Sequence, residues 1–225
     1  MIIKVCGMRD AENIRAVEQI GVDWIGFIFW QDSPRYVKQI NSRAGIIPDY
    51  PSLKDGNDEI QCHRDVKRVG VFVDDMPQNI VTRVFNFKLD IIQLHGSENT
   101  VMIDNLRRTL DPDIKAGIKI IKALNISTLE DVEKTREYEG HVDYFLFDTK
   151  TLCKGGSGEK FNWSLLNAYN GNVPFLLSGG IGPDDVDVVK AFKHPMFVGI
   201  DLNSRFETAP AVKDVDLIKK FISQL

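Results

Sequence analysis

Residues 145–158, Phe-Leu-Phe-Asp-Thr-Lys-Thr-Leu-Cys-Lys-Gly-Gly-Ser-Gly, contain the pattern that decides the fold. An apolar run from Tyr144 to Phe147 ends abruptly in Asp148, and the polar loop after it becomes glycine-rich at residues 155–158. Such a run is typical of a buried strand, here one that places a carboxylate at its carboxyl end. The glycines allow the following backbone to come close to a ligand.

Seven further apolar runs have the same character and predict buried parallel strands. They are Ile2–Cys6, Trp24–Phe29, Val69–Val73, Ile91–Leu94, Ile118–Lys122, Phe175–Leu177 and Phe197–Ile200. Most segments between them have helical spacing. In residues 10–20, for example, Ile14, Val17 and Ile20 lie on one face, and Asp10 is a possible N-cap. The pattern of strand and helix therefore repeats eight times.

Alternating strands and helices predict an α/β protein with a parallel sheet covered by helices. Eight units in 225 residues fit a single (β/α)8 TIM barrel that occupies residues 1–225 as one domain. An open doubly wound sheet is the alternative, but the order of the units gives no sign of a reversal. The barrel is the favoured prediction.

The second unit is irregular. Residues 41–64 contain Gly45, Pro48, Pro51 and Gly56 beside a polar cluster, a composition that disfavours a helix. We expect a degenerate second helix and an irregular loop around residues 41–64, to which no role is assigned.

Composition limits the partners of the chain. The net charge is −4, with 27% charged residues of mixed sign and no basic block, which argues against nucleic acid as a partner. The three cysteines are widely spaced, so reduced thiols are expected rather than disulfides or a metal site. The apolar runs are too short for a signal peptide or a membrane span, which predicts a cytoplasmic protein with no membrane partner.

Cys6 is the candidate general base. In a (β/α)8 barrel the chemistry is built at the carboxyl ends of the strands, where Cys6-Gly7 ends the first run. Lys4 lies two residues earlier, about 6.6 Å along the same strand face. We expect its ammonium to favour the thiolate of Cys6, which is a suitable base near neutral pH. The alternative is that Cys6 is only a small buried apolar residue.

Asp148 is the candidate general acid. At the end of an apolar strand its carboxyl is expected to be partly desolvated, which favours the protonated form that an acid needs. The alternative is a cap within the next turn. A base and an acid on opposite sides of one barrel mouth suit proton transfer between two carbons or between carbon and oxygen.

Glycine-rich segments predict a phosphate site. Ser178-Gly179-Gly180 follows the seventh run and Asn203-Ser204 follows the eighth, where barrels commonly hold phosphate. Glycines let backbone N–H groups face a phosphate. Gly156 and Ser157, in the loop after Asp148, are expected to add to this site or to close over the substrate.

Arg35 and His95 complete the predicted mouth. Arg35 follows Ser33-Pro34 and could bind a carboxylate through two hydrogen bonds. A surface salt bridge is equally compatible with the sequence. His95 follows the fourth run and either orients the substrate or is satisfied by the backbone. The fifth run ends near Lys122, so that lysine is also expected at the mouth.

The motifs, in order along nearly the whole chain, closely resemble those of the phosphoribosylanthranilate isomerase family of tryptophan biosynthesis. The motifs are Lys4-Val-Cys-Gly7, Gly26-Phe-Ile-Phe29, Ser33-Pro-Arg-Tyr36, Val69-Gly-Val-Phe-Val73, Gln93-Leu-His-Gly96, Phe147-Asp-Thr149, Gly155-Gly-Ser-Gly158, Leu177-Ser-Gly-Gly180 and Gly199-Ile-Asp-Leu-Asn-Ser204.

The resemblance implies an Amadori rearrangement of N-(5'-phosphoribosyl)anthranilate to 1-(2-carboxyphenylamino)-1-deoxyribulose 5-phosphate. It implies that Asp148 protonates the ring oxygen, that Cys6 removes the C2' proton, that Arg35 binds the anthranilate carboxylate and that the glycine loops bind the phosphate. No cofactor and no metal are implied, and the only partners expected are this small phosphorylated aminosugar and, in a homodimer, a second copy. The remaining alternatives are another phosphosugar isomerase or epimerase, a decarboxylating synthase, and a non-catalytic phosphate-binding barrel.

Three positions depart from the family pattern. Ser157 stands where threonine is common, Asn162 where aspartate is common, and Arg205 where glycine is frequent. Ser157 keeps the hydroxyl and Asn162 can still cap a helix. Arg205 is compatible with a place near the phosphate and with an outward orientation.

Overall fold

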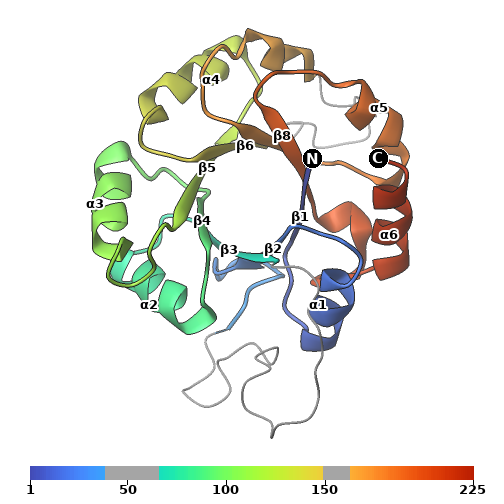
Figure 1. The fold of residues 1–225 in the computed structure, drawn as a ribbon, viewed down its shortest axis with the longest axis horizontal. Helices are drawn as coiled ribbons and strands as arrows, with labels where there is room; N and C mark the ends of the chain where they lie inside the picture. Colours follow the sequence, from blue (N-terminus) through green and yellow to red (C-terminus); the bar gives the residue numbers. More distant parts are fainter. Residues whose placement is uncertain (39–65, 149–162) are drawn as a thin grey trace, which may run out of the picture.

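The computed structural model describes residues 1–38, 66–148 and 163–225, and its eight parallel strands close into a barrel in chain order. In Figure 1 the strands form an inner ring that is surrounded by helices. The strands are β1 (Ile2–Cys6), β2 (Trp24–Ile28), β3 (Lys67–Phe72), β4 (Ile91–Leu94), β5 (Lys119–Asn125), β6 (Tyr144–Asp148), β7 (Phe175–Ser178) and β8 (Phe197–Leu202). The predicted irregular loop at 41–64 and the residues Gly156 and Ser157 lie outside the described residues.

The barrel closes by direct pairing of β1 with β8, and the open-sheet alternative is therefore wrong. Ile2 lies beside Gly199, and Lys4 lies beside Asp201. A Cβ atom at Gly199 would stand 2.3 Å from the backbone oxygen of Ile2, so a side chain there would push the two strands apart. Glycine at this position allows the ring to close.

Helices lie between most of the strands, as the spacing predicts, and the first is shorter than the predicted 10–20. They are α1 (Ala11–Glu18), α2 (Pro77–Phe87), α3 (Thr100–Leu110), α4 (Leu129–Glu133), α5 (Val186–Ala191) and α6 (Val215–Ser223), with 3-10 turns η2 (Lys134–Tyr138), η3 (Trp163–Ala168), η4 (Pro183–Asp185) and η5 (Ser204–Phe206). Asp10 caps α1 as predicted, because its carboxylate accepts the N–H of Asn13 at 2.9 Å. The last helix begins after Asp214, and Lys213 belongs instead to a two-stranded sheet of β9 (Glu207–Ala209) and β10 (Val212–Lys213).

Side chains alternate between the inside of the barrel and the layer under the helices, as a strand period of two requires. The inner cluster contains Trp24, Val69, Ile91, Ile121, Ala123, Leu146 and Leu176. On β5 the residues Ile121 and Ala123 are inside, so Lys122 is outside, where its Nζ lies 2.9 Å from Glu98 Oε2. The expectation of Lys122 at the mouth is therefore wrong: β5 continues to Asn125, and Asn125 takes that place.

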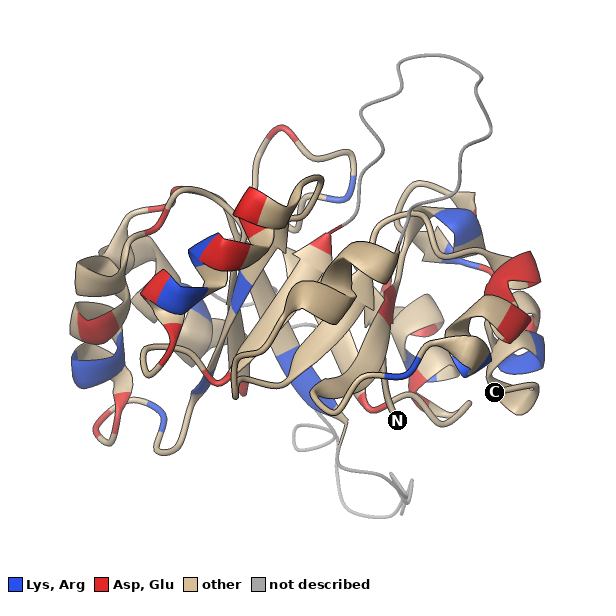
Figure 2. Cartoon of the chain, turned by 90° about the horizontal axis from the view of Figure 1, so that it is seen from above, with Lys and Arg blue, Asp and Glu red and all other residues tan. Residues whose placement is uncertain are grey.

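Charges of both signs are spread over the outer layer. Figure 2 shows Lys and Arg interspersed with Asp and Glu along the helices. Among the described residues, no helix combines the length and the apolar composition needed to cross a bilayer.

Candidate active site

A cavity of about 530 Å³ lies at the carboxyl ends of the strands. Eight of the predicted site residues line it: Cys6, Arg35, His95, Asp148, Gly179, Gly180, Asn203 and Ser204. Gly156 and Ser157 were also predicted there but fall outside the described residues. Barrel closure thus gathers, in one cavity, groups from the ends of β1, β4, β6, β7 and β8 and from the segment after β2.

Cys6 lies at the end of β1 and is 4% exposed. Room for its sulfur comes from β2, because a Cβ atom at Gly26 would stand 2.8 Å from Cys6 Sγ. Burial raises the pKa of the thiol, although Lys4 and Lys213 oppose this rise. Lys4 therefore has the expected effect on Cys6, since it lowers the pKa of the thiol, but burial outweighs this effect in the ligand-free chain.

Lys4 and Asp201 form a buried ion pair beneath the mouth. Lys4 is fully buried, and its Nζ lies 2.9 Å from Asp201 Oδ1. Burial alone would lower the pKa of Lys4, but Asp201 and Cys6 beside it raise the pKa overall. The hydroxyl of Ser178 donates to the other carboxylate oxygen of Asp201 at 3.3 Å. The lysine ammonium is thus fixed next to Cys6 by a carboxylate that also lines the cavity.

Asp148 at the end of β6 is 4% exposed and faces His95, with 3.4 Å between Asp148 Oδ2 and the ring atom Nε2. The other ring nitrogen, Nδ1, lies 3.0 Å from the side-chain amide nitrogen of Gln93. An amide nitrogen only donates, so Nδ1 accepts and the ring proton sits on Nε2, toward Asp148. His95 is therefore held by side chains, and it directs a donor at the candidate acid.

Arg35 crosses the mouth from the segment after β2. Its Nε and Nη2 donate to Glu207 Oε1 and Oε2 at 2.8 and 2.6 Å, respectively. Glu207 raises the pKa of Arg35 through these bonds, and with only 5% of the Glu207 side chain exposed, the pair is not a surface salt bridge. A Cβ atom at Gly7, where φ is +78°, would stand 2.5 Å from Arg35 Cδ, so a side chain at position 7 would collide with the arginine.

The ends of β7 and β8 form an open, polar corner of the cavity. Gly179 and Gly180 adopt φ values of +88° and +76°, a backbone region that favours glycine. A Cβ atom at Gly180 would meet nothing within 4 Å, so the loop is accessible to a ligand. The guanidinium of Arg205 lies against this loop, with its Nε 3.0 Å from the Cβ position at Gly182.

Sequence reasoning missed three polar groups that line the cavity: Gln93, Asn125 and Asp201. The signal was present, since Gln93 lies two residues before His95, and Asp201 two before Asn203, on the same strand face. Asn125 was missed because β5 extends three residues beyond the apolar run that predicted it.

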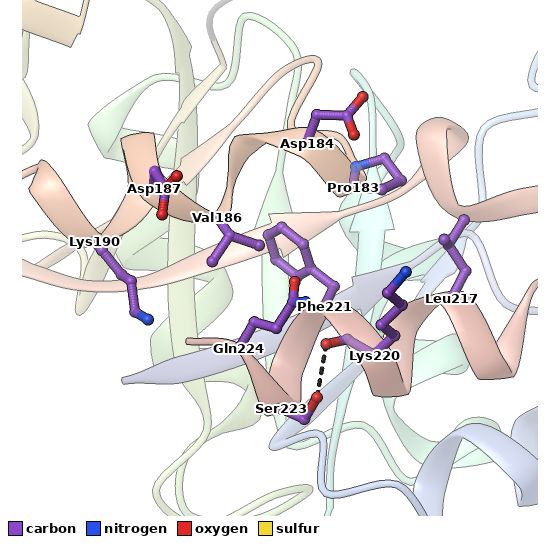
Figure 3. A pocket seen from close by; sticks show the side chains of 10 residues that line it. All are labelled: Pro183, Asp184, Val186, Asp187, Lys190, Leu217, Lys220, Phe221, Ser223 and Gln224. Carbon is purple, nitrogen blue, oxygen red and sulfur yellow. Dashed lines mark hydrogen bonds between the residues drawn. The ribbon is translucent and has the colours of Figure 1, made fainter.

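A second hollow lies on the outer layer between α5 and α6, and Figure 3 shows the side chains around it. Its lining includes Asp187, Lys190, Lys220 and Phe221 but none of the predicted site residues. The cavity at the mouth is therefore the candidate active site.

Comparison with known proteins agrees with this geometry. The model of the family described as N-(5'phosphoribosyl)anthranilate (PRA) isomerase matches residues 3–224. The N-(5'-phosphoribosyl)anthranilate isomerase of Parabacteroides distasonis is 46% identical over 225 residues, which cover 100% of this chain and 93% of the relative.

Two solved structures are also similar. The crystal structure of phosphoribosyl anthranilate isomerase from Thermotoga maritima has a TM-score of 0.74 and 31% identity, covering 100% of this chain and 98% of the other. A structure of the same enzyme in complex with reduced 1-(o-carboxyphenylamino)-1-deoxyribulose 5-phosphate has a TM-score of 0.74 and 28% identity at the same coverage. The chain therefore belongs to the N-(5'-phosphoribosyl)anthranilate isomerase family.

Proposed function

We propose that the chain converts N-(5'-phosphoribosyl)anthranilate to 1-(2-carboxyphenylamino)-1-deoxyribulose 5-phosphate, with Asp148 as general acid and Cys6 as general base. One observation supports this assignment most strongly. Cys6 and Asp148 line a single cavity from β1 and β6, two strands that are separated by β7 and β8 around the ring. A substrate between them receives a proton on one side and loses one on the other.

Asp148 acts first. Its carboxyl donates a proton to the furanose ring oxygen, the bond from C1' to that oxygen breaks, and the nitrogen lone pair forms a protonated Schiff base at C1'. Loss of the proton leaves Asp148 as a carboxylate that faces the Nε2–H of His95. In the ligand-free chain, His95 Nε2 lies 3.4 Å from Asp148 Oδ2. A donor at that position stabilises the conjugate base and therefore assists the proton transfer.

Cys6 acts second. Its thiolate takes the proton from C2', and the electrons of that bond move toward the positive nitrogen to give an enolamine, which becomes the ketone on protonation at C1'. The nitrogen of the Schiff base serves as the electron sink, so this sequence uses no cofactor. Formation of the ketone also releases the proton of the C2' hydroxyl, which balances the proton taken up at C1'. The positive Schiff base, together with Lys4 and Lys213, opposes the burial that raises the pKa of the free thiol and so favours release of the thiol proton to solvent before this step.

The ends of the substrate are assigned to separate corners. Arg35 is proposed to bind the anthranilate carboxylate. The loop at Gly179-Gly180 and the residues Asn203 and Ser204 are proposed to bind the phosphate, with Gly156 and Ser157 also assigned to it on sequence grounds. Arg205 is added to this set, because its guanidinium lies against the glycine loop.

The alternatives are less well supported. A phosphosugar epimerase or a decarboxylating synthase usually places metal ligands or a catalytic lysine at the mouth. Within residues 1–38, 66–148 and 163–225, no group of three or more His, Cys, Asp or Glu side chains is arranged to hold a metal ion. A non-catalytic barrel would have lost the acid or the base, whereas both Cys6 and Asp148 are present.

The biological setting follows from the activity. We infer that residues 1–225 form one domain that works in the cytoplasm on this small molecule, as a monomer or a homodimer. A Thermotoga maritima relative that is 28% identical is described as dimeric and has been crystallised as monomers generated from the dimer.

The first test removes each proton-transfer group. We expect Cys6→Ser and Asp148→Asn each to lower kcat by more than about 100-fold, the usual contribution of general acid–base catalysis. The measurement is the decrease of anthranilate fluorescence as the substrate is consumed. Turnover near the wild-type rate in either variant would contradict the mechanism.

The second test concerns the protonation state of Cys6 in the ligand-free chain. Because its pKa is raised, the thiol should stay protonated at neutral pH, and thiolate should form only above the ordinary value of 9.0. Labelling with iodoacetamide, followed residue by residue by mass spectrometry against pH, measures the midpoint. In urea, where burial is lost, the same residue should titrate at its ordinary value. A native midpoint below about 8 would show that the lysines outweigh burial.

The third test concerns Arg205. We expect Arg205→Ala to raise KM roughly tenfold, which is the size of one charge-assisted hydrogen bond. The value of kcat should change little, because the contact is made equally in the ground state and in the transition state. Inorganic phosphate should inhibit the variant correspondingly less well. Arg108→Ala, an exposed arginine on α3, is the matched control. An unchanged inhibition constant for phosphate would place Arg205 outside the site.

A further inference from the structure

Two charged side chains that the proposed chemistry does not place in contact with the substrate lie behind Arg35. Glu207 on β9 accepts both of the Arg35 hydrogen bonds described above, and Lys213 on β10 donates to the same carboxylate. Lys213 Nζ also donates to Asn203 Oδ1 at 2.8 Å. The side chains of Lys213 and Glu207 are 0% and 5% exposed, and neither lines the cavity.

The small sheet of β9 and β10 is anchored so that these two side chains stay in place. The backbone N–H and oxygen of Lys213 are both bonded to the side chain of Asn13 on α1, each at 2.8 Å. The N–H of Ala211, where φ is +70°, donates to Glu207 Oε1 at 3.2 Å. β10 is thereby tied to α1, and the turn between β9 and β10 is tied to the Glu207 side chain.

The three side chains carry unequal charge. Burial alone would raise the pKa of Glu207, but its bonds to Arg35 and Lys213 lower it, so Glu207 is a carboxylate at neutral pH. Burial lowers the pKa of Lys213, although its bond to Glu207 opposes this fall. With Lys213 protonated, as its short contact with the carboxylate favours, Arg35 and Lys213 are two cations against one anion. The bonds to Glu207 use Nε and Nη2 of Arg35 and do not involve Nη1.

We propose that Glu207 and Lys213 are positioning residues that fix Arg35 for the carboxylate of the substrate and maintain one uncompensated positive charge there. The pair makes the chain selective for aminosugar phosphates whose aromatic ring carries a carboxylate. Held on two atoms by Glu207, the guanidinium loses little freedom when the substrate binds, and preorganisation of this kind increases affinity. This inference rests on the proposed function, and in particular on the role of Arg35.

The experiment compares two ligands. One is reduced 1-(o-carboxyphenylamino)-1-deoxyribulose 5-phosphate, and the other is the same molecule without the carboxyl group. Calorimetry gives both affinities for the wild-type chain, Glu207→Gln, Lys213→Met and the control Glu133→Gln, which changes an exposed glutamate on α4. The quantity of interest is the ratio of the two affinities, in which a partial loss of folded protein cancels.

We expect Glu207→Gln to weaken the carboxylated ligand by about tenfold or more, and to change the ligand without a carboxyl by less than about threefold. Lys213→Met should weaken both ligands, because Lys213 also bonds Asn203, but it should weaken the carboxylated ligand more. The control should change neither. In turnover, Glu207→Gln should raise KM more than it lowers kcat. The direction of the change in affinity for Glu207→Gln distinguishes the two explanations. Removal of a negative charge by itself would strengthen the binding of an anion, whereas loss of the positioning of Arg35 weakens it.

Three results would overturn the inference: equal weakening of both ligands, no weakening of either, or tighter binding of the carboxylated ligand to Glu207→Gln. The wild-type chain separates this failure from that of the proposed function. If it binds neither ligand, the proposed function fails and the inference with it. If it binds both equally while still turning over substrate, only the carboxylate site and this inference fail.

Discussion

The pairing of β1 with β8 is the constraint on which the rest of the structure depends. It places Lys4 beside Asp201, and the two form an ion pair whose lysine is fully buried below the mouth. Breaking one partner of such a pair would leave an uncompensated buried charge, at a cost of roughly 3–5 kcal/mol. The pairing also brings the first and last strands together, so that Cys6 on β1 and Asn203 after β8 share a cavity with Asp148.

The charged side chains around that cavity form separate groups at different positions. The Lys4–Asp201 pair is neutral as a whole and lies under Cys6. The Arg35–Glu207–Lys213 group has one excess positive charge, which suits a bound carboxylate. On the opposite side, Asp148 faces the Nε2 atom of His95. In the proposed mechanism, this division would hold a substrate by its carboxylate and its phosphate at the two ends, with its sugar between Asp148 and Cys6.

Much of the fold and of the site could be predicted from sequence, because barrel strands have a simple period and end in polar residues. The eight apolar runs located the strands. Because active sites of such barrels lie at the carboxyl ends of the strands, Cys6, Asp148 and His95 were predicted to lie at one mouth. The errors have physical causes. Lys122 was placed at the mouth because β5 was taken to end with its apolar run. The effect of Lys4 on the pKa of Cys6 has the expected direction, but the larger opposing effect of burial was not foreseen, because a sequence does not display burial. Glu207 was missed because it lies 172 residues from its partner Arg35, on a small sheet that no local pattern predicted.

The most direct test of the central claim is a crystal structure of the chain with reduced 1-(o-carboxyphenylamino)-1-deoxyribulose 5-phosphate. The proposed mechanism predicts Cys6 Sγ within about 3.5 Å of C2', a distance that permits reaction. It also predicts the Asp148 carboxyl within hydrogen-bond reach of the oxygen that closes the furanose ring, at about 3 Å. A ligand bound in the cavity with C2' turned away from Cys6, or with Asp148 out of reach of that oxygen, would contradict the assignment of base and acid.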